Sequence, residues 1–315
     1  MLSIVIPFKG DQKAAQKLMR LFELIINNGS KNNFEVIIVD SSDAVSLVHP
    51  NLTVIRKNVG VGEARNIGVK VSEGDVILFI DADCMIPRGF IDKAYELALE
   101  TGNEICAVGG PVECIPTKSV IQKYLDYSLF TQFPRVSKEY IFDLKNCYRR
   151  HPNMCNLIVK KRVFLEVGGC WNSYGEDVYF ILKLIKNGYK IKFSPQLKIY
   201  HDHPSNVTKL ARTYYRNGKS AAKIVLTFFP SSFILYRLFR YLVFTMLFLF
   251  CFFLPILVPI LFASLSAYYL IRTHNWKSAI LYPILDVVLQ IVYIVAFSQT
   301  MLKESMSKVR AWMKK

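Results

Sequence analysis

Short runs of apolar residues alternate with helix-like segments over the first hundred residues. The strands that we predict from these runs cover residues 3–8, 35–40, 52–55 and 75–81. The helices expected between them cover residues 14–26 and 62–71. Strands that are apolar throughout are buried on both faces, which is typical of a mostly parallel sheet covered by helices. The opening of this chain therefore predicts an α/β domain.

The carboxyl ends of two of these strands carry an aspartate. Asp40 ends the second strand and Asp81 ends the fourth. In open parallel sheets, ligands bind in the crevice beyond the carboxyl ends of the strands. We therefore expect Asp40 and Asp81 to lie at a ligand site. Further elements, among them strands over residues 190–194 and 197–201, are expected to close the domain near residue 204.

The C-terminal third is too apolar for an ordinary soluble domain. Hydrophobic residues make up 52% of the chain, and the surplus lies after Tyr236. No charged residue stands between residues 241 and 271, a stretch that as a helix would be about 45 Å long, more than one span needs. Residues 278–302 form a second such stretch, charged only at Asp286. We expect two membrane helices over residues 241–302, with a third left open.

Asp286 would be costly inside a membrane span, and such residues are functional candidates by default. It could equally pair with a polar group on the neighbouring span or lie near the membrane surface. We therefore leave Asp286 out of the predicted site.

Charge indicates how the chain meets the membrane. The formal net charge is +16, and both the segment before residue 241 and the tail over residues 303–315 are basic. Placing both on the cytosolic side satisfies the positive-inside tendency, so we expect a multi-pass protein of the cell membrane with a cytosolic catalytic domain. The first residues lack the long apolar region of a signal peptide. Such a positive charge suits either nucleic acid or an anionic membrane surface. The chain has no nucleic-acid-binding motif and its C-terminal third is apolar, so we expect a lipid bilayer as the partner and no nucleic acid.

Residues 205–226 have the pattern of a basic amphipathic helix. One face carries small and apolar residues, and the other carries Lys209, Arg212, Arg216, Lys219 and Lys223. Such a helix suits a membrane surface or a phosphate-bearing substrate. A helix docked on the domain with a solvated basic face is the alternative. We assign residues 205–240 to interfacial helices of this kind.

Three motifs carry candidate chemistry. Asp81-Ala-Asp83 follows an apolar strand, and two carboxylates on one turn can hold a hard divalent cation that also contacts phosphates. In the glycine-rich segment 58–68, Arg65 lies near a helix N-terminus and could bond a diphosphate. Gly175-Glu176-Asp177 begins a helix, where Asp177 could cap the helix or accept a proton from an attacking hydroxyl.

The order of these segments resembles family 2 of the inverting nucleotide-sugar glycosyltransferases. The matching segments are residues 3–7, 38–43, 58–68, 81–83, 156–161, 168–169, 175–177, 188–189 and 195. The resemblance covers nearly all of the globular part. It implies a glycosyltransferase A-type catalytic domain over residues 1–204, with Mg²⁺ or Mn²⁺ as the cofactor and a nucleotide sugar as the donor.

The resemblance also implies roles for individual residues. Asp177 would be the catalytic base. Asp83 would hold the metal ion, together with His201 or, as a substitute, His203. The donor site would include Pro7, Asp40, Arg65, Asn66 and Asp81.

Two departures from the family pattern bear on function. Ser41 stands where many members have a second aspartate, which leaves one nucleoside contact open. The chain has no Q-x-x-R-W motif, the mark of processive synthases, so it resembles enzymes that add one sugar. We expect transfer to a hydroxyl of a lipid-linked or cell-envelope glycan. The alternatives are a polyprenyl-phosphate glycosyltransferase and a non-catalytic, membrane-tethered sugar-nucleotide-binding protein.

Overall fold

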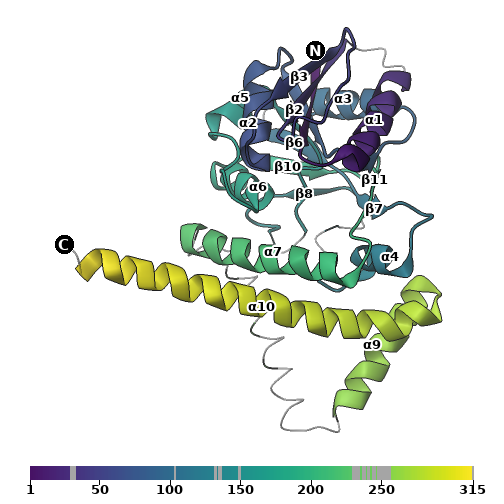
Figure 1. The fold of residues 1–315 in the computed structure, drawn as a ribbon, viewed down its shortest axis with the longest axis vertical. Coiled ribbons are helices and arrows are strands. Elements are labelled where there is room, and N and C mark those ends of the chain that lie inside the picture. Colours follow the sequence, from purple (N-terminus) through teal and green to yellow (C-terminus); the bar gives the residue numbers. More distant parts are fainter. Residues whose placement is uncertain are drawn as a thin grey trace. The chain divides into compact units, whose positions relative to one another are not determined.

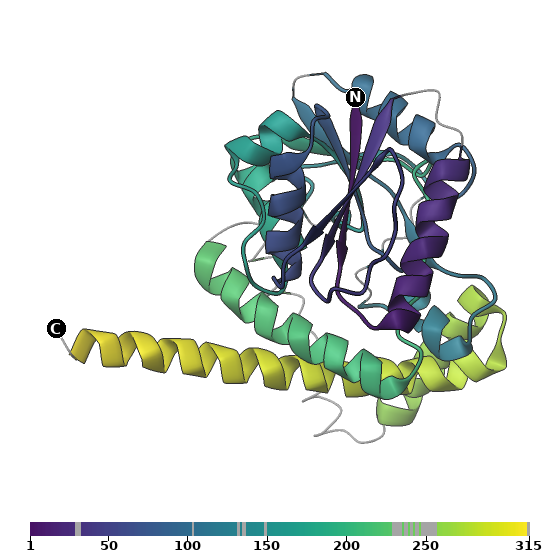
Figure 2. The same cartoon turned by 45° about the horizontal axis from the view of Figure 1, so that its top comes forward.

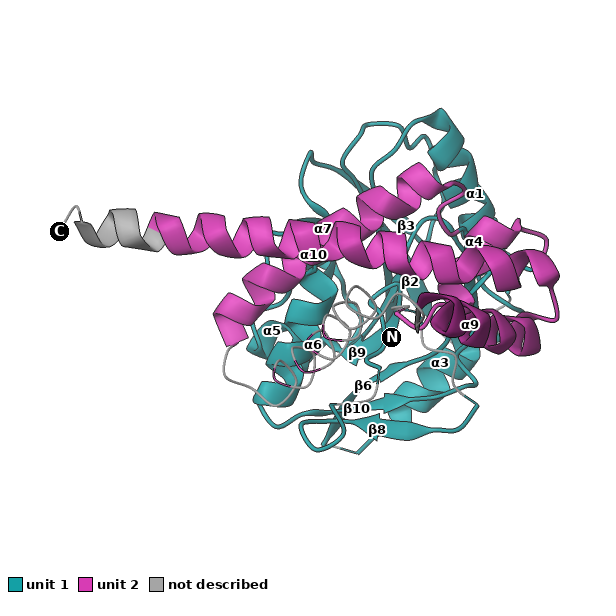
Figure 3. Cartoon of the chain, turned by 90° about the horizontal axis from the view of Figure 1, so that it is seen from below, with its two compact units in different colours: residues 1–116, 132–202 teal, residues 117–131, 203–315 magenta. Residues whose placement is uncertain are grey.

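A computed structural model describes residues 1–28, 33–102, 104–130, 133, 137–147, 150–228, 235, 239, 242, 246 and 257–313. The chain forms two compact units (Figure 3). Unit 1 comprises residues 1–116 and 132–202, and unit 2 comprises residues 117–131 and 203–315. A short segment from the first part of the chain thus belongs to the same unit as the C-terminal helices.

Unit 1 is built on an eight-stranded mixed sheet (Figure 1). Its strands, in spatial order, are β3 (Leu52–Arg56), β2 (Phe34–Asp40), β1 (Leu2–Phe8), β4 (Val76–Ile80), β9 (Asn156–Lys160), β6 (Ile105–Gly109), β10 (Lys190–Phe193) and β8 (Tyr140–Phe142). The first four are parallel, and β9 runs antiparallel to both β4 and β6. The predicted α/β fold is confirmed, with antiparallel pairs in the second half of the sheet.

The register brings the predicted ligand residues to one edge. Phe8 at the end of β1 pairs with Asp40 at the end of β2, and β1 also pairs with β4, which Asp81 follows. Parallel neighbours end at the same edge of a sheet. The predicted placement of Asp40 and Asp81 beyond adjacent carboxyl ends is therefore confirmed.

Helices cover both faces of the sheet, as Figure 2 shows for α1 on one side and α2 on the other. These helices are α1 (Gln12–Asn27), α2 (Val61–Val71), α3 (Phe90–Leu99), α5 (Lys161–Glu166) and α6 (Glu176–Lys186). Alternate strand residues point to opposite faces. Leu78 of β4 packs in the core with α1 and α3, whereas its neighbour Phe79 contacts Phe164 of α5. This two-sided burial explains why the strands are apolar throughout.

A second, three-stranded sheet forms beside the end of β4. It consists of β5 (Cys84–Met85), β11 (Ile199–His201) and β7 (Val112–Cys114), with β11 in the centre. His201 pairs with Cys84, the residue that follows Asp83. This small sheet therefore carries His201 to the Asp81-Ala-Asp83 turn.

The structure describes four helices in unit 2. They are α4 (Val120–Tyr127), α7 (Val207–Phe228), α9 (Leu257–Thr273) and α10 (Trp276–Met313). In the described part of the chain, one helix, over residues 276–307, is long and apolar enough to cross a membrane. The apolar helix over residues 258–273 is shorter, and most of the expected first span, 241–271, lies outside the described residues. The multi-pass expectation is therefore corrected to one candidate membrane helix.

The predicted basic helix is present as α7. Leu210, Tyr214 and Gly218 on its apolar face are buried, whereas four of the five predicted cations are exposed and Lys223 is half-buried. A Cβ atom at Gly218 would lie 2.3 Å from the carbonyl oxygen of Tyr293, so this glycine permits close packing of α7 on α10. The predicted division between an apolar and a basic face is confirmed.

Asp286 is buried in unit 2 and paired. Its carboxylate accepts hydrogen bonds from the hydroxyls of Tyr124 and Ser128, each at 2.6 Å, and from the hydroxyl of Tyr269. Three donors compensate the burial of one carboxylate. Of the alternatives open in the sequence, pairing with polar groups is the one observed.

Candidate active site

Asp40 turns its carboxylate toward its own loop. Oδ1 accepts hydrogen bonds from the backbone N–H and the hydroxyl of Ser42, at 2.8 and 2.9 Å, and Oδ2 accepts from the N–H groups of Ala44 and Val45, each at 2.8 Å. Burial by itself raises the pKa of Asp40, but these hydrogen bonds outweigh it and hold the pKa below its usual value. Asp40 thus shapes the loop beyond β2, and its contact with a nucleoside stays a prediction.

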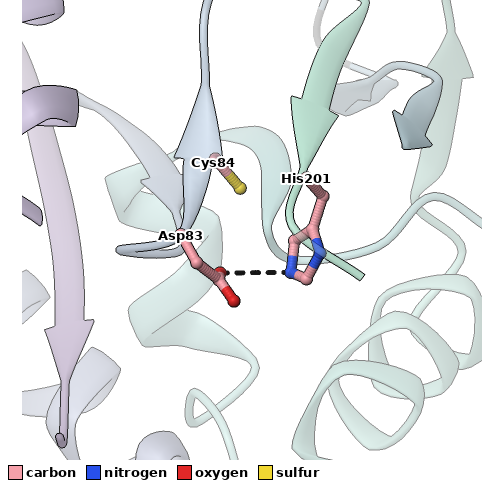
Figure 4. Close-up of side chains that lie close together, drawn as sticks. All are labelled: Asp83, Cys84 and His201. Atoms are coloured by element: carbon pink, nitrogen blue, oxygen red, sulfur yellow. Dashed lines mark ion pairs between the residues drawn. The ribbon is translucent and has the colours of Figure 1, made fainter. Parts of the chain in front are cut away.

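Asp83 and His201 lie together, as Figure 4 shows. Oδ1 of Asp83 is 3.2 Å from Nε2 of His201. Burial lowers the pKa of His201, but the Asp83 carboxylate more than offsets this and raises the pKa to about 10. Burial likewise opposes ionisation of Asp83, but His201 and, more weakly, Lys17 hold its pKa below the usual value. The two side chains form an ion pair when no metal ion is bound.

The donor set suits a divalent cation. Ligands at about 2.0–2.1 Å on neighbouring positions of an octahedral ion are about 3 Å apart, close to the 3.2 Å observed between Asp83 and His201. The Asp83 side chain is 39% exposed, so the pair is accessible from solvent. The carboxylate oxygen suits Mg²⁺ or Mn²⁺, and the imidazole nitrogen favours Mn²⁺ over Mg²⁺, which takes oxygen ligands. The residues present therefore fit the implied metal.

Cys84 is a third group near this pair that we did not predict from the sequence. Asp83, Cys84 and His201 offer ligand atoms that all lie within 4.8 Å of one another. Cys84 is buried, and burial raises the pKa of its thiol well above the usual value. A protonated thiol is a poor metal ligand. Asp83 and His201 remain the candidate ligands.

Arg65 connects two distant parts of the chain. Its Nη2 lies 2.8 Å from Oδ1 of Asp81, and its Nη1 lies 2.5 Å from Oε1 of Glu176. The residue is only 2% exposed, and its Nε has no hydrogen-bond partner in the part of the chain that the structure describes. Burial by itself lowers the pKa of Arg65, but the charges of Asp81 and Glu176 outweigh burial, and the net effect raises the pKa. The guanidinium is therefore permanently charged. The ion pairs join the Asp81-Ala-Asp83 turn to the start of α6.

Asn66 is engaged with backbone rather than with an open pocket. Its Nδ2 donates to the carbonyl of Cys170 and its Oδ1 accepts from the Cys170 N–H, both at 2.9 Å. A Cβ at Gly169 would lie 2.5 Å from Oδ1 of Asn66, and Gly169 has a φ of +60°. Asn66 therefore fixes the loop that leads to α6, and its predicted donor contact stays a prediction.

The glycine-rich start of α2 also serves packing. A Cβ at Gly62 would lie 2.2 Å from the carbonyl oxygen of Trp171 and 3.1 Å from Cβ of Glu176. Only glycine allows this approach of helix and loop. Gly62 therefore lets α2 approach the segment that carries Glu176.

Asp177 stands in the first turn of α6, beside Glu176. Gly175 precedes the helix with a φ of +85°, a backbone conformation that favours glycine. Asp177 is half-buried, and its Oδ1 accepts a hydrogen bond of 2.7 Å from the N–H of Val178. Glu176 accepts a hydrogen bond from Arg65. Burial raises the pKa of Glu176, and Arg65 opposes that rise.

The remaining predicted residues lie as follows. Pro7 is half-buried on β1, next to the end of the strand. His203 is fully buried, with its Nε2 3.3 Å from Oδ1 of Asp126 on α4. His203 is therefore paired with Asp126, and His201 is the histidine beside Asp83.

Comparison with known proteins identifies the family. Residues 3–167 match the model of glycosyl transferase family 2. An uncharacterized glycosyltransferase from Haemophilus influenzae is 29% identical over 223 residues, which is 66% of this chain and 71% of that protein. Glycosyltransferase AglE from Haloferax volcanii is 24% identical over 243 residues, 71% of this chain and 73% of that protein.

Solved structures share the fold. Mannosyltransferase PcManGT from Pyrobaculum calidifontis, in complex with GDP-Man and Mn²⁺, superposes with a TM-score of 0.58 at 16% identity, covering 96% of this chain and 86% of that one. TarS from S. aureus, in complex with UDP-GlcNAc, gives a TM-score of 0.53 at 14% identity, covering 97% and 92%. With the family match over more than half of the chain, this protein belongs to glycosyl transferase family 2 and is an enzyme that transfers a sugar from a nucleotide sugar.

Proposed function

We propose that the protein moves one sugar, with inversion, from a nucleoside-diphosphate sugar to a hydroxyl of a lipid-linked or cell-envelope glycan. The observation that carries the proposal is the ion-pair chain from Asp81 through Arg65 to Glu176. It ties the Asp81-Ala-Asp83 turn to the helix start that bears Asp177. A diphosphate-binding group and a base are thereby held in one charged cluster.

Asp177 acts as the base in this proposal. The acceptor oxygen attacks the anomeric carbon while the bond from that carbon to the diphosphate oxygen breaks, and the hydroxyl proton passes to Asp177. Asp177 suits this role because it is half-buried in the first turn of α6, next to Glu176, which pairs with Arg65. Attack from the face opposite the leaving group inverts the anomeric centre.

Asp83 and His201 would hold Mg²⁺ or Mn²⁺, which when bound neutralises charge on the departing diphosphate. Asp81, fixed by Arg65, would contact the donor beside it. The buried Nε of Arg65, which has no partner among the described residues, is the atom left to serve a phosphate oxygen or an ordered water. The predicted donor contacts of Pro7, Asp40 and Asn66 belong to the same proposal.

The acceptor class and location rest on other observations. The net charge of +16, the basic face of α7 and the apolar α10 support a location at the cytosolic face of the cell membrane. A lipid-linked acceptor is available at that surface. The undecaprenyl-phosphate 4-deoxy-4-formamido-L-arabinose transferase of Proteus mirabilis is 22% identical over 220 residues, 60% of this chain and 66% of that protein. Polyprenyl phosphate is therefore the second acceptor to test.

Asp177→Asn tests the base. We expect transfer to fall by about 10²–10⁴-fold with the affinity for the nucleotide sugar retained, because only proton removal is lost. Glu96→Gln, at an exposed carboxylate of α3, is the matched control and should keep full activity. Undiminished transfer by Asp177→Asn would refute the assignment, and loss of donor binding would place Asp177 at the donor instead.

The acceptor is tested with two lipids that share one polyprenyl chain. One ends in a monophosphate and the other in a diphosphate-linked sugar with free hydroxyls. We expect product from the sugar-bearing lipid only, and expect Asp177→Asn to abolish it. If product forms from the monophosphate lipid, the acceptor group is a phosphate and the proposed hydroxyl acceptor is wrong. Donor binding without product or donor hydrolysis, with Mn²⁺ present, would indicate a non-catalytic binding protein.

A further inference from the structure

The outer face of α10 is an apolar stripe. Between Lys277 and Lys303 its exposed positions recur every three or four residues, and all but Ser298 and Gln299 are apolar. The large exposed side chains of the stripe are Ile280, Ile284, Val288, Ile291, Val295, Leu302 and Met306. Four polar residues of this helix are instead buried, namely Ser278, Asp286, Gln290 and Thr300. A helix that is apolar outside and polar inside is suited to lipid.

By length and composition α10 could cross a bilayer, but its partners in unit 2 argue otherwise. Figure 3 shows α7 crossing α10, and the close contact of Gly218 with Tyr293 and Ala296 marks the crossing. Tyr293 lies about 26 Å along the helix from Trp276, near the middle of the candidate span 276–307. If α10 crossed the membrane, this contact would lie near the bilayer centre.

Such a placement would bury the cations of α7 in hydrocarbon. Lys219 directly follows Gly218 and Arg216 lies two residues before it, and both are exposed. The sequence of α7 itself contains no acidic residue. A cation at the bilayer centre is costly, so a spanning α10 conflicts with the packing of α7.

α4 leads to the same conclusion at another point of α10. Tyr124 and Ser128 donate to Asp286, and the hydroxyl of Tyr282 donates to the carbonyl of Val120 at 2.7 Å. Val120 is the first residue of α4, directly after the capping residue Ser119 and close to Lys118. A spanning α10 would draw this polar helix start into the membrane as well.

We propose that α10 lies in the plane of the membrane surface, with its apolar stripe immersed in the lipid and α7 on its other side. The basic face of α7 then stays at the headgroups, where Lys and Arg are attracted by anionic lipids. The exposed apolar surface of α9, which includes Val258, Ile260 and Phe262, extends the apolar area of the same unit. The occupant of the stripe is thus an anionic phospholipid bilayer, not a second protein.

A depth profile tests this arrangement in the full chain, reconstituted in vesicles of phosphatidylcholine and phosphatidylglycerol. Nitroxide labels are attached to Ile284→Cys, Ile291→Cys and Leu302→Cys, three exposed positions on the stripe. The six described native cysteines are buried, and the unsubstituted chain measures the background. Quenching by lipid-soluble oxygen and by a water-soluble nickel chelate reports depth.

An in-plane helix gives similar depths at all three positions, about 5–10 Å below the headgroup boundary. A spanning helix gives a gradient, since Ile284 and Ile291 differ by about 10 Å along the axis. Such a gradient overturns the proposal. Labels with no lipid contact overturn it too, and show that protein covers the stripe.

A label at Lys219→Cys on α7 supplies the matched comparison, because it replaces an exposed residue next to the crossing. It should be quenched by the water-soluble reagent. If the label at position 219 is instead shielded from the water-soluble reagent and lies deep in the bilayer, the proposal is contradicted, whatever the labels on the stripe show. Neither measurement depends on sugar transfer, so their outcome is separate from that of the proposed reaction.

Discussion

Arg65 and Glu176 are joined by an ion pair of 2.5 Å across 111 residues of sequence, at a point where both side chains are almost fully buried. The same guanidinium binds Asp81, so one arginine neutralises two carboxylates from separate segments. Buried charges are stable only when they are paired. The geometry of this site therefore depends on all three residues together.

Removing one carboxylate should expose that dependence. We expect Glu176→Ala to lower the free energy of unfolding by about 3–5 kcal/mol, because it leaves a buried guanidinium with one partner fewer. Glu176→Gln keeps an acceptor oxygen and should cost about 1–3 kcal/mol. Chemical denaturation measures both.

Glu104→Gln is the matched control for this experiment. Glu104 forms an ion pair with Lys190 at the same 2.5 Å distance, but its side chain is 76% exposed. We expect no measurable loss of stability there, since solvent screens exposed pairs. Equal losses at Glu104 and Glu176 would show that burial is not what makes the Arg65 pair important.

Metal binding should require Asp83 and His201. Asp83→Asn or His201→Gln should weaken Mn²⁺ binding at least about tenfold and reduce transfer in parallel. His274→Asn, at an exposed histidine in the turn before α10, should bind Mn²⁺ as the unsubstituted chain does. Calorimetry or the electron paramagnetic resonance of free Mn²⁺ measures this affinity. Unchanged affinity in both site variants would exclude this pair as the ligands.

Mn²⁺ affinity should also depend on pH. The pKa of His201 is raised to about 10 by Asp83, so the imidazole is protonated at neutral pH and must lose its proton to bind a metal ion. The Asp83–His201 ion pair stabilises the apo fold fully below the unfolded pKa of about 6.5, and this contribution is lost as the pH rises through 10. We therefore expect Mn²⁺ affinity to rise by up to about tenfold per pH unit between pH 7 and 8, with release of one proton. A flat profile would be inconsistent with the ion pair.

Asp40 should contribute stability that is lost in acid. Its pKa is held below the usual value, so its contribution is present above about pH 4 and disappears as the pH falls through the folded-state pKa. At pH 7 we expect Asp40→Asn to cost about 1–3 kcal/mol, because an amide cannot accept all four hydrogen bonds. The difference from the unsubstituted chain should shrink toward pH 3. A difference that stays constant with pH would show that the ionised form is not what stabilises the loop.

Gly62→Ala should damage the site although alanine favours helices. Its Cβ would collide with the Trp171 carbonyl and separate α2 from the segment that holds Glu176. We expect a loss of about 1–3 kcal/mol in stability and reduced transfer, measured by denaturation and by the transfer assay. Gly102→Ala, where a Cβ meets no atom within 4 Å, is the control. Equal behaviour of the two variants would contradict the proposed packing role.

The sequence by itself determined the architecture of unit 1 and the edge at which its site lies. Strands covered by helices on both faces must be apolar throughout, so the runs that contain Val36–Val39 and Val76–Ile80 could be recognised without a structure. The position of Asp40 and Asp81 at the site edge was predicted because each ends a strand. The apolar and basic faces of α7 were predicted from the spacing of its residues along a helix. These features are local, because backbone geometry alone sets their periodicity.

Only the tertiary structure decided which side chains meet. The pairing of β11 with β5 brings His201 to Asp83, and no spacing in the sequence encodes this contact. Glu176 was part of a recognised motif, but its partner Arg65 could be identified only once α2 and α6 were packed together. The tertiary structure likewise turned Asp40 and Asn66 toward backbone groups and set α7 across α10. Long-range contacts depend on how complete elements pack, and the residue pattern within each element does not record that packing.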